Sequence, residues 1–396
     1  MKKIIVILVM CICSISANAM PFTIEGKITG LEIGDTLSFE RMILPGSSTE
    51  AAFNIIIEKQ DEFYYRGSHN HVNCYYMTYK PANEQISQDD GPHLVFLVKD
   101  GTTRLSGKSV ENIEIQSEIY NEALQEVMKL ENALSAERNE YHRNYRAAYA
   151  SGDTVKGNEY IDKFNNFYSI REKEYAKLEE MRNQYYNDFP SSEYTVLTNL
   201  KSASYTPFAE SLAKYNKMSE SAQNDYLGKL YKNILDKLAL LEAGNNAPDF
   251  HLKTITGREI SLEDFRGKYV LIYHWGLCPG SLMIDKDVIA LYQKYKEHLE
   301  VIGVTESIES ISSLYEDIDE NMELVGIKLK PVLKNMLEHP WLDVELTKEN
   351  EKISSDYEFG GMPFFIFISP EGKIIHREFH DAFYTARKEL KSKFSE

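Results

Sequence analysis

Residues 275–281, Trp-Gly-Leu-Cys-Pro-Gly-Ser, form the stretch that decides the fold of the C-terminal part of this chain. An apolar run typical of a strand, residues 269–274, precedes the stretch, and a segment with helical character follows it. A cysteine at the first turn of a helix lies among backbone N–H groups that lack helical partners, at the positive end of the helix dipole. Because both features favour the thiolate, Cys278 is predicted to be a nucleophile.

Around this stretch, strands and helices alternate from residue 247 onward, which predicts an α/β domain. The run Gly-Asn-Asn at 244–246 is the predicted boundary, so the domain is expected to span 244–396. Further apolar strands are predicted at 302–304, 364–368 and 373–375. A final helix is predicted from about residue 382 to 394.

The region before this domain divides into a β-rich part and a helical part. Residues 20–116 contain short alternating or apolar runs separated by Gly, Asp, Asn and Ser, which is the pattern of an antiparallel, sandwich-like domain. A hairpin turn is predicted at 99–102. Residues 117–243 carry apolar residues at helical spacing, interrupted at 151–153. The predicted fold class is therefore multidomain: an all-β domain, an α-helical region and an α/β domain.

The overall composition is that of a globular protein, with 396 residues of which 43% are hydrophobic and 27% are charged. The formal net charge of -17 argues against nucleic acid as a partner, because phosphate contacts need clustered Lys and Arg. Neither a metal-ligand set nor a phosphate-binding glycine loop is evident, so no metal and no cofactor are expected.

The N-terminus has the three parts of a secretory signal peptide. Lys2 and Lys3 give a positive start, residues 4–15 are apolar, and Ala-Asn-Ala at 17–19 fits a cleavage site. The apolar run is short for a bilayer, so a cleaved signal peptide is expected at 1–19 rather than a membrane span. The protein is therefore predicted to be exported, with the periplasm as its location.

Few cysteines remain after removal of that segment. The chain has 4 cysteines, and Cys11 and Cys13 lie within 1–19. Cys74 and Cys278 are too few for a disulfide framework, and they lie in segments predicted to be different domains. Both are therefore expected to remain thiols, with Cys74 as a buried residue of a Tyr-rich strand.

Five segments of the C-terminal domain stand out in order: Asn-Ala-Pro-Asp-Phe at 246–250, residues 256–268, the corner at 275–281, Gly-Gly-Met-Pro at 360–363, and Pro-Glu-Gly-Lys at 370–373. In this order they resemble landmarks of exported thioredoxin-like proteins of the ResA and TlpA thiol-disulfide oxidoreductase type. The β-rich region is also similar to a domain that precedes such modules in Bacteroidetes.

This resemblance implies a set of site residues. Cys278 and Ser281 would be the catalytic positions. A cis bond before Pro363 would place the Met362 backbone beside Cys278, where a substrate strand can pair with it. Trp275 would shield the sulfur and offer an apolar docking surface. The residues expected to contact substrate are Trp275, Pro279, Met362 and Pro363.

The corner departs from the family in one decisive atom, because Ser281 stands where the second cysteine is usual. In a dithiol site the first thiolate forms a mixed disulfide and the second thiol resolves it. A hydroxyl cannot take that second step, although it can donate a hydrogen bond to the Cys278 thiolate. The Glu and Pro that usually follow are also replaced, by Ile284 and Lys286.

Three functions remain open from the sequence. The first is thiol-disulfide exchange through Cys278 alone, resolved by an outside thiol, with thiol- or disulfide-bearing envelope proteins or peptides as partners. The second is a thioredoxin-fold binding module without catalysis. The third is a peroxiredoxin-like peroxidase, since Leu-Cys-Pro at 277–279 resembles the Val-Cys-Pro of that family. Trp275, however, stands where a peroxiredoxin would need its threonine.

Overall fold

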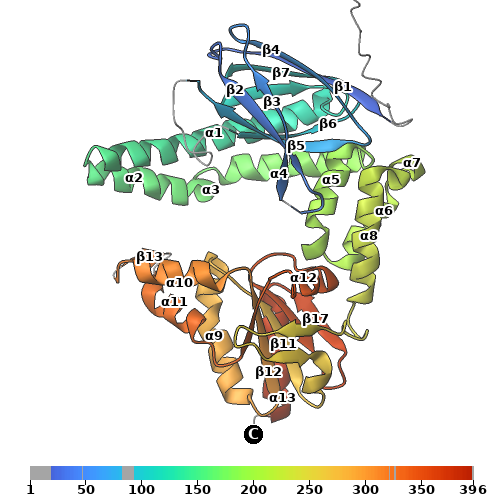
Figure 1. The fold of residues 1–396 in the computed structure, drawn as a ribbon, viewed down its shortest axis with the longest axis vertical. Helices are drawn as coiled ribbons and strands as arrows, with labels where there is room; N and C mark the ends of the chain where they lie inside the picture. Colours follow the sequence, from blue (N-terminus) through green and yellow to red (C-terminus); the bar gives the residue numbers. More distant parts are fainter. Residues whose placement is uncertain (1–18, 47, 83–92, 321, 325–326, 395–396) are drawn as a thin grey trace, which may run out of the picture. The chain divides into compact units, whose positions relative to one another are not determined.

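The computed structural model describes residues 19–46, 48–82, 93–320, 322–324 and 327–394 (Figure 1). The predicted signal peptide, 1–19, lies outside the described residues except for its last residue. The chain forms two compact units: residues up to 197 with 218–227, and residues 198–217 with 228–396. The predicted domain ranges, 20–116, 117–243 and 244–396, stay predictions, because helices of the middle range belong to both units.

Two four-stranded sheets make up the β-rich part of the first unit. One sheet has the order β4-β1-β7-β8, with strands Met20–Ile28 (β1), Glu62–His69 (β4), Gly101–Ser109 (β7) and Asn112–Gln116 (β8). The other has the order β3-β2-β5-β6, with strands Thr36–Met42 (β2), Thr49–Ile56 (β3), Asn73–Lys80 (β5) and His93–Val98 (β6). The ring of Phe22 lies 6.2 Å from those of Phe53 and Tyr75, so aromatic side chains of the two sheets pack together. The β-rich region is thus confirmed.

The hairpin predicted at 99–102 is wrong. β6 ends at Val98 and β7 begins at Gly101, but the two strands belong to different sheets. β7 instead pairs in parallel with β1, with Phe22 opposite Gly101. A short turn that contains glycine fits both a hairpin and a passage between two facing sheets, because turn residues do not choose the partner of the next strand.

The helices of the first unit follow the predicted pattern. α1 (Glu122–Ala150) and α2 (Thr154–Asn165) are separated at the expected break. Gly152 has a φ of 81°, and the Asp153 side chain caps α2 by accepting a hydrogen bond from the Lys156 N–H. The other helices that lie in or begin in this unit are α3 (Phe167–Ile170), α4 (Glu172–Asp188), α5 (Glu193–Ser202), α7 (Glu220–Asn224) and α8 (Tyr226–Leu240).

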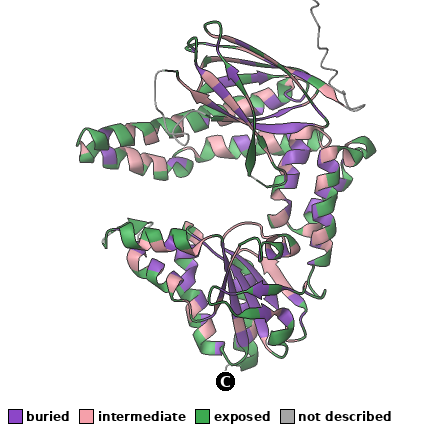
Figure 2. Cartoon of the chain, in the orientation of Figure 1, coloured by how far each residue is buried: buried purple, intermediate pink, exposed green. Residues whose placement is uncertain are grey.

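The second unit is built on a five-stranded sheet with the order β15-β12-β11-β16-β17. β11 pairs in parallel with β12 and antiparallel with β16, and every residue of β11 and β16 is buried (purple in Figure 2). The strands are Tyr269–His274 (β11), Leu299–Thr305 (β12), Leu342–Glu345 (β15), Phe364–Ile368 (β16) and Ile374–Glu378 (β17). The predicted α/β domain is confirmed, and β15 is a strand that the sequence patterns did not predict.

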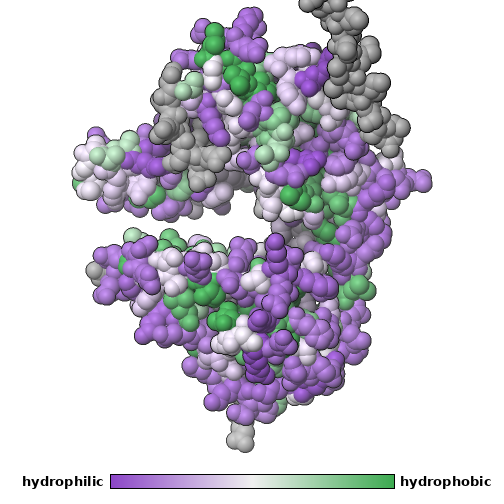
Figure 3. All heavy atoms as spheres, in the orientation of Figure 1, coloured by the Kyte–Doolittle hydropathy of each residue, from purple (hydrophilic) through white to green (hydrophobic). Residues whose placement is uncertain are grey.

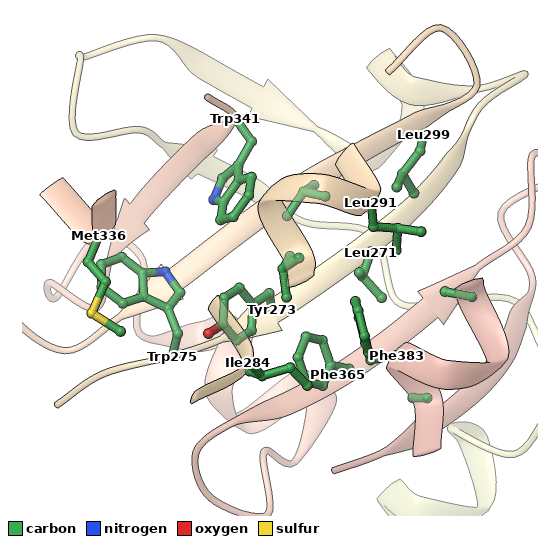
Figure 4. Packing of buried hydrophobic residues seen from close by; sticks show 14 of the residues in the cluster. Leu271, Tyr273, Trp275, Ile284, Leu291, Leu299, Met336, Trp341, Phe365 and Phe383 are labelled. Atoms are coloured by element: carbon green, nitrogen blue, oxygen red, sulfur yellow. The ribbon is translucent and has the colours of Figure 1, made fainter. Parts of the chain in front are cut away.

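Helices cover one face of this sheet in a single buried cluster (Figure 4). The side chains of Tyr269, Leu271 and Tyr273 project from β11 into that cluster. Its helical members come from α9 (Pro279–Tyr295), α10 (Ile308–Asp317), α11 (Leu329–Leu337) and α13 (His380–Phe394). Because β11 is apolar on both faces, it is held at the centre of the sheet, and its last residue leads directly into the corner at 275–281.

Short elements complete the second unit. They are η1 (Ala203–Tyr205), α6 (Phe208–Asn216), β9 (His251–Lys253), β10 (Glu259–Ser261), η2 (Leu262–Phe265), β13 (Glu323–Leu324), β14 (Ile327–Lys328) and α12 (Lys352–Tyr357). The face drawn in Figure 3 is mainly hydrophilic and carries small hydrophobic patches, in keeping with a net charge of -17.

The central position of β11 gives a direct stability test. Leu271→Ala removes a side chain that is 0% exposed, and we expect the free energy of unfolding of the second unit to fall by about 2–5 kcal/mol. Urea unfolding followed by tryptophan fluorescence measures this, because both tryptophans of the chain, Trp275 and Trp341, lie in that unit. Leu240→Ala, at a side chain that is 66% exposed, is the control and should cost less than about 0.5 kcal/mol. Equal losses would contradict the central placement of β11.

Candidate functional site

The corner between β11 and α9 places Cys278 as the sequence predicted. Cys278 is the N-cap of α9, with extended backbone angles, and Pro279 is the first helical residue. Proline suits that position because its missing N–H would have no helical partner there. The Ser281 N–H donates a hydrogen bond to Cys278 Sγ over 3.3 Å. The sulfur thus accepts a hydrogen bond from one of the N–H groups of the first turn, which have no partner within the helix.

Two oxygen atoms also lie within hydrogen-bond reach of the sulfur. Cys278 Sγ is 3.1 Å from Ser281 Oγ and 3.4 Å from the carbonyl oxygen of Met362, so the thiol can donate to either. Ser281 is completely buried, and its Oγ accepts a hydrogen bond from the Gly276 N–H over 3.3 Å. The serine hydroxyl is therefore fixed between the loop before Cys278 and the sulfur itself.

The loop that carries Met362 approaches the corner closely. The Met362–Pro363 peptide bond is cis, and β16 begins at the next residue. Glycines make the approach possible: a Cβ on Gly276 would lie 2.6 Å from Met362 Sδ, and one on Gly280 would lie 2.7 Å from Pro363 Cδ. Both distances are too short for carbon contacts, so these two glycines leave the space that the loop fills.

His274 ties the end of β11 to the same loop. Its Nδ1 is 2.8 Å from the carbonyl oxygen of Gly361, and a carbonyl only accepts, so Nδ1 carries the proton. The ring stacks on Phe359, with 4.6 Å between the centroids. Burial lowers the pKa of His274, although the hydrogen bond to Gly361 opposes this, so the ring is neutral at pH 7.

The surface around the sulfur differs from the prediction at Trp275. The Trp275 side chain is 0% exposed, so it offers no docking surface, and that expectation is wrong. The ring packs within the apolar cluster, where its Nε1 donates a hydrogen bond to Asp343 Oδ1 over 3.1 Å. Leu277 is 43% exposed, and Pro279 is exposed as well. Cys278 and Met362 are partly exposed, whereas Pro363 is buried.

A segment far from the corner in sequence also reaches the Met362 loop. The Cβ position of Gly360 would lie 2.9 Å from Tyr205 Cβ and 3.0 Å from the Ser204 carbonyl oxygen. The Tyr205 ring lies 6.3 Å from that of Phe379 and remains partly open to solvent. The sequence patterns did not indicate this, because η1 belongs to the helical region and carries no motif.

A buried polar group of three side chains lies next to the corner, and the sequence reasoning missed it. His339 Nε2 is 2.9 Å from Asp285 Oδ1, and His339 Nδ1 is 2.9 Å from Asp343 Oδ2. Burial by itself would lower the pKa of His339, but the hydrogen bonds to the two carboxylates outweigh it and raise the pKa to about 9. The available signal was local: His339 and Asp343 stand four residues apart on either side of Trp341.

The described residues include no group of three or more His, Cys, Asp or Glu side chains arranged to hold a metal ion. The same residues include no helix with both the length and the apolar content needed to cross a bilayer. Neither Cys74 nor Cys278 forms a disulfide within the part of the chain that the structure describes.

Comparison with known proteins relates this domain to two groups. Residues 243–377 match the AhpC/TSA family. The thiol-disulfide oxidoreductase ResA of Geobacillus thermodenitrificans is 31% identical over 81 residues, which are 19% of this chain and 47% of ResA. A protein of Helicobacter pylori provisionally named peroxiredoxin bcp is 41% identical over 68 residues, 16% of this chain and 45% of its own. The chain thus spans about half the length of the curated relatives it matches.

Among solved structures, the thioredoxin domain of a thiol-disulfide oxidoreductase from Bacteroides vulgatus is 25% identical and covers 38% of this chain and 99% of its own, with a TM-score of 0.29. The family match over residues 243–377 and the order of the strands support a thioredoxin-like fold for the C-terminal part of the chain.

The two thiols should differ in their reaction with iodoacetamide. Cys278 is partly exposed, whereas Cys74 is buried beside Met42, with 3.4 Å between the sulfur atoms. We expect native protein to be alkylated at Cys278 first and at Cys74 only after unfolding in guanidinium chloride. Peptide mapping by mass spectrometry measures both, and Cys278→Ser is the control. Native labelling of Cys74 at the same rate would contradict the described burial.

Proposed function

We propose that this protein carries out thiol-disulfide exchange through Cys278 alone. The observation that carries the proposal is the position of one partly exposed sulfur at the N-terminus of α9, 3.3 Å from the Ser281 amide nitrogen and 3.4 Å from the Met362 carbonyl oxygen. The relationship to proteins named thiol-disulfide oxidoreductase supports it. The reaction would belong to the predicted C-terminal domain, 244–396.

The first step follows from the chemistry of the thiolate. Cys278 Sγ attacks one sulfur of a substrate disulfide, the substrate S–S bond breaks, and a new S–S bond joins Cys278 to the substrate. The other substrate sulfur leaves as a thiolate and takes a proton from solvent. The Ser281 N–H stabilises the attacking sulfur, and the Ser281 hydroxyl can donate to it once the thiol proton has left.

Resolution of this mixed disulfide needs a thiol from outside the corner. Ser281 occupies the position of the resolving thiol, and its hydroxyl does not exchange with disulfides. Cys74 is buried in β5, with its sulfur against that of Met42, so it is not available in the folded chain. An external thiol, or a second cysteine of the substrate, would attack the mixed disulfide and release Cys278 as a thiolate.

Substrates would be disulfide- or thiol-bearing proteins or peptides of the cell envelope. Of the residues first expected to contact them, Pro279 and Met362 remain in the proposal, and exposed Leu277 takes the place of buried Trp275. Pro363 is buried, so its proposed part is to hold the Met362 backbone beside Cys278. The predicted signal peptide at 1–19 supports export to the periplasm, where substrate disulfides persist.

Peroxide reduction is the second candidate, favoured by the relationship to the peroxiredoxin named bcp. In that reaction Cys278 would attack the peroxide and become a sulfenic acid. The hydrogen bonds described for Cys278 are to Ser281 and Met362, and none of those between described residues joins it to an arginine. Rapid loss of hydrogen peroxide that disappears in Cys278→Ser would favour this function over exchange.

Restoring the second thiol tests whether the corner still supports exchange. Ser281→Cys would place a second sulfur where Oγ now lies, 3.1 Å from Cys278 Sγ, so an internal disulfide can form and resolve a mixed disulfide. We expect Ser281→Cys to reduce insulin with dithiothreitol as reductant faster than the wild-type chain does. Ser281→Ala, which removes the hydroxyl without adding a thiol, is the matched control. No gain in Ser281→Cys would favour a binding module without catalysis.

Trapping tests the single-cysteine step directly. A peptide with an activated mixed disulfide should become attached to wild-type protein at Cys278, and added glutathione should release it. Intact-mass spectrometry follows both events. Attachment should persist in a Cys74→Ser variant and vanish in Cys278→Ser. Attachment that depends on Cys74 would refute the proposed site.

A further inference from the structure

We propose that His339 is a positioning residue for Cys278, acting through a buried bridge formed by the side chains of Asp285, His339 and Asp343. This inference deepens the function proposed above and rests on it. The bridge does not touch substrate. It fixes both the loop before Cys278 and the helix after it.

Each end of the bridge contacts or belongs to a segment that forms the corner at 275–281. Asp285 lies on α9, one turn beyond Ser281, and Asp343 lies on the edge strand β15. His339 joins them with two contacts of 2.9 Å. The side chains of Asp285, His339 and Asp343 are 1%, 0% and 5% exposed. The bridge therefore ties the helix that starts at Cys278 to the sheet.

The second oxygen of Asp343 extends the bridge to the loop. Asp343 Oδ1 accepts hydrogen bonds from Trp275 Nε1 and from Trp341 Nε1, each over 3.1 Å. Figure 4 shows both indole rings beside Tyr273, at one end of the cluster of buried side chains. Because Trp275 precedes Cys278 by three residues, a single carboxylate holds the loop on one side of the sulfur while Asp285 holds the helix on the other.

Gly303 shows that the sheet makes room for this arrangement. A Cβ at Gly303 on β12 would overlap Asp343 Oδ1 and would lie 2.7 Å from Trp275 Nε1 and 2.9 Å from Trp341 Nε1. Any side chain at this position would displace the carboxylate or the indoles. The space above this glycine is filled by the Asp343 carboxylate and the two indole nitrogen atoms that donate to it.

The charge of the bridge follows from its hydrogen bonds. Carboxylates accept and do not donate, so both nitrogen atoms of His339 must carry protons, and the ring is a cation between two anions. A buried charge is costly unless it is paired, so the three groups depend on one another. One acceptor is left over: Asp285 Oδ2 is buried and has no hydrogen-bond partner among the described residues.

Tyr273 lies near both indoles, with its ring centroid 6.5 Å from that of Trp275 and 6.3 Å from that of Trp341. Its hydroxyl is buried and has no partner within hydrogen-bond geometry in the described part of the chain. Burial raises the pKa of Tyr273 well above its usual value, and the charges of Asp285, Cys278 and Asp343 add to this. Among the described residues, the ionisable groups that act on the pKa of His339 are Asp285 and Asp343. Tyr273, which the same two carboxylates affect, remains neutral throughout the pH range considered below.

The bridge should loosen in alkaline solution. The pKa of His339 is raised to about 9 in the folded chain, above its ordinary value of 6.5. Its stabilising contribution is therefore complete below pH about 6.5 and is lost as the pH rises through about 9. Neutral His339 can keep only one of its two contacts with the carboxylates as a donor.

Both tryptophans of the chain contact the bridge, so fluorescence reports on it. In full-length Cys278→Ser, which removes the thiolate signal, we expect indole emission to change with a midpoint near pH 9. Adding His339→Gln should abolish this transition, whereas adding His298→Gln, at an exposed histidine of the same unit, should leave it. A transition that persists in His339→Gln, or that is absent from Cys278→Ser, would overturn the inference.

A second variant covers the case in which His339→Gln does not fold. Asp285→Asn keeps the shape and an acceptor oxygen but removes one of the two charges that hold the His339 proton. The fluorescence midpoint should then move from near pH 9 toward 6.5 rather than disappear. An unchanged midpoint would show that Asp285 does not hold that proton, which contradicts the bridge.

Reactivity links the bridge to the sulfur. At pH 7 the rate of Cys278 alkylation by iodoacetamide should fall by roughly tenfold in His339→Gln, because the corner loses its fixed geometry and two carboxylates lose their cation. An unchanged rate, together with a normal fluorescence transition in the parent, would refute the positioning role. If alkylation falls as expected but wild-type protein never exchanges disulfides, the proposed function fails and the positioning role stands.

Discussion

The whole site depends on the first turn of α9, where one sulfur must be both fixed and open to solvent. Cys278 receives a hydrogen bond from the helix that it begins, and it lies against the carbonyl oxygen of Met362. The residues that support Cys278 from the interior, namely β11, Trp275 and Ser281, are all buried. Helix geometry supplies the donor, and the buried surroundings keep it aimed at the sulfur.

Buried charge beside such a corner needs an explanation, because apolar packing could fill the same volume at lower cost. Here two carboxylates and one imidazolium take the place of apolar side chains. Their hydrogen bonds connect α9, β15 and the loop that carries Trp275 in one fixed arrangement. Asp343 accepts a hydrogen bond from each of the two indole N–H groups, which adds a directional constraint to the packing of both rings. Directional hydrogen bonds thus set the loop, and the glycine at 303 accommodates them.

The sequence predicted what is local and left out what is not. Apolar periodicity found β11 and β16 at their observed bounds, and the strand-turn-helix pattern placed Cys278 at a helix start. The contact with Met362 came from resemblance, since no spacing rule joins residues 84 apart. The burial of Trp275 and the contact between Asp285 and His339 could not be predicted, because their partners are distant in sequence and β15, which carries Asp343, is too short to leave a pattern. The hairpin between β6 and β7 was predicted wrongly for the same reason, because β1, the strand with which β7 pairs, is distant in sequence.

Ser281 lies at the position where the resembling proteins usually carry a second cysteine, and this sets what the proposed reaction would require. In the proposed exchange reaction, a mixed disulfide at Cys278 would have no second thiol in the corner to break it, so its lifetime would be set by how fast an outside thiol reaches the sulfur. If that thiol arrived quickly, the protein would turn over as an exchange catalyst; if it arrived slowly, the protein would keep its substrate bound as a mixed disulfide. Access of that thiol would depend on the partial exposure of Cys278, which lies between exposed Leu277 and Pro279 and against the carbonyl oxygen of Met362.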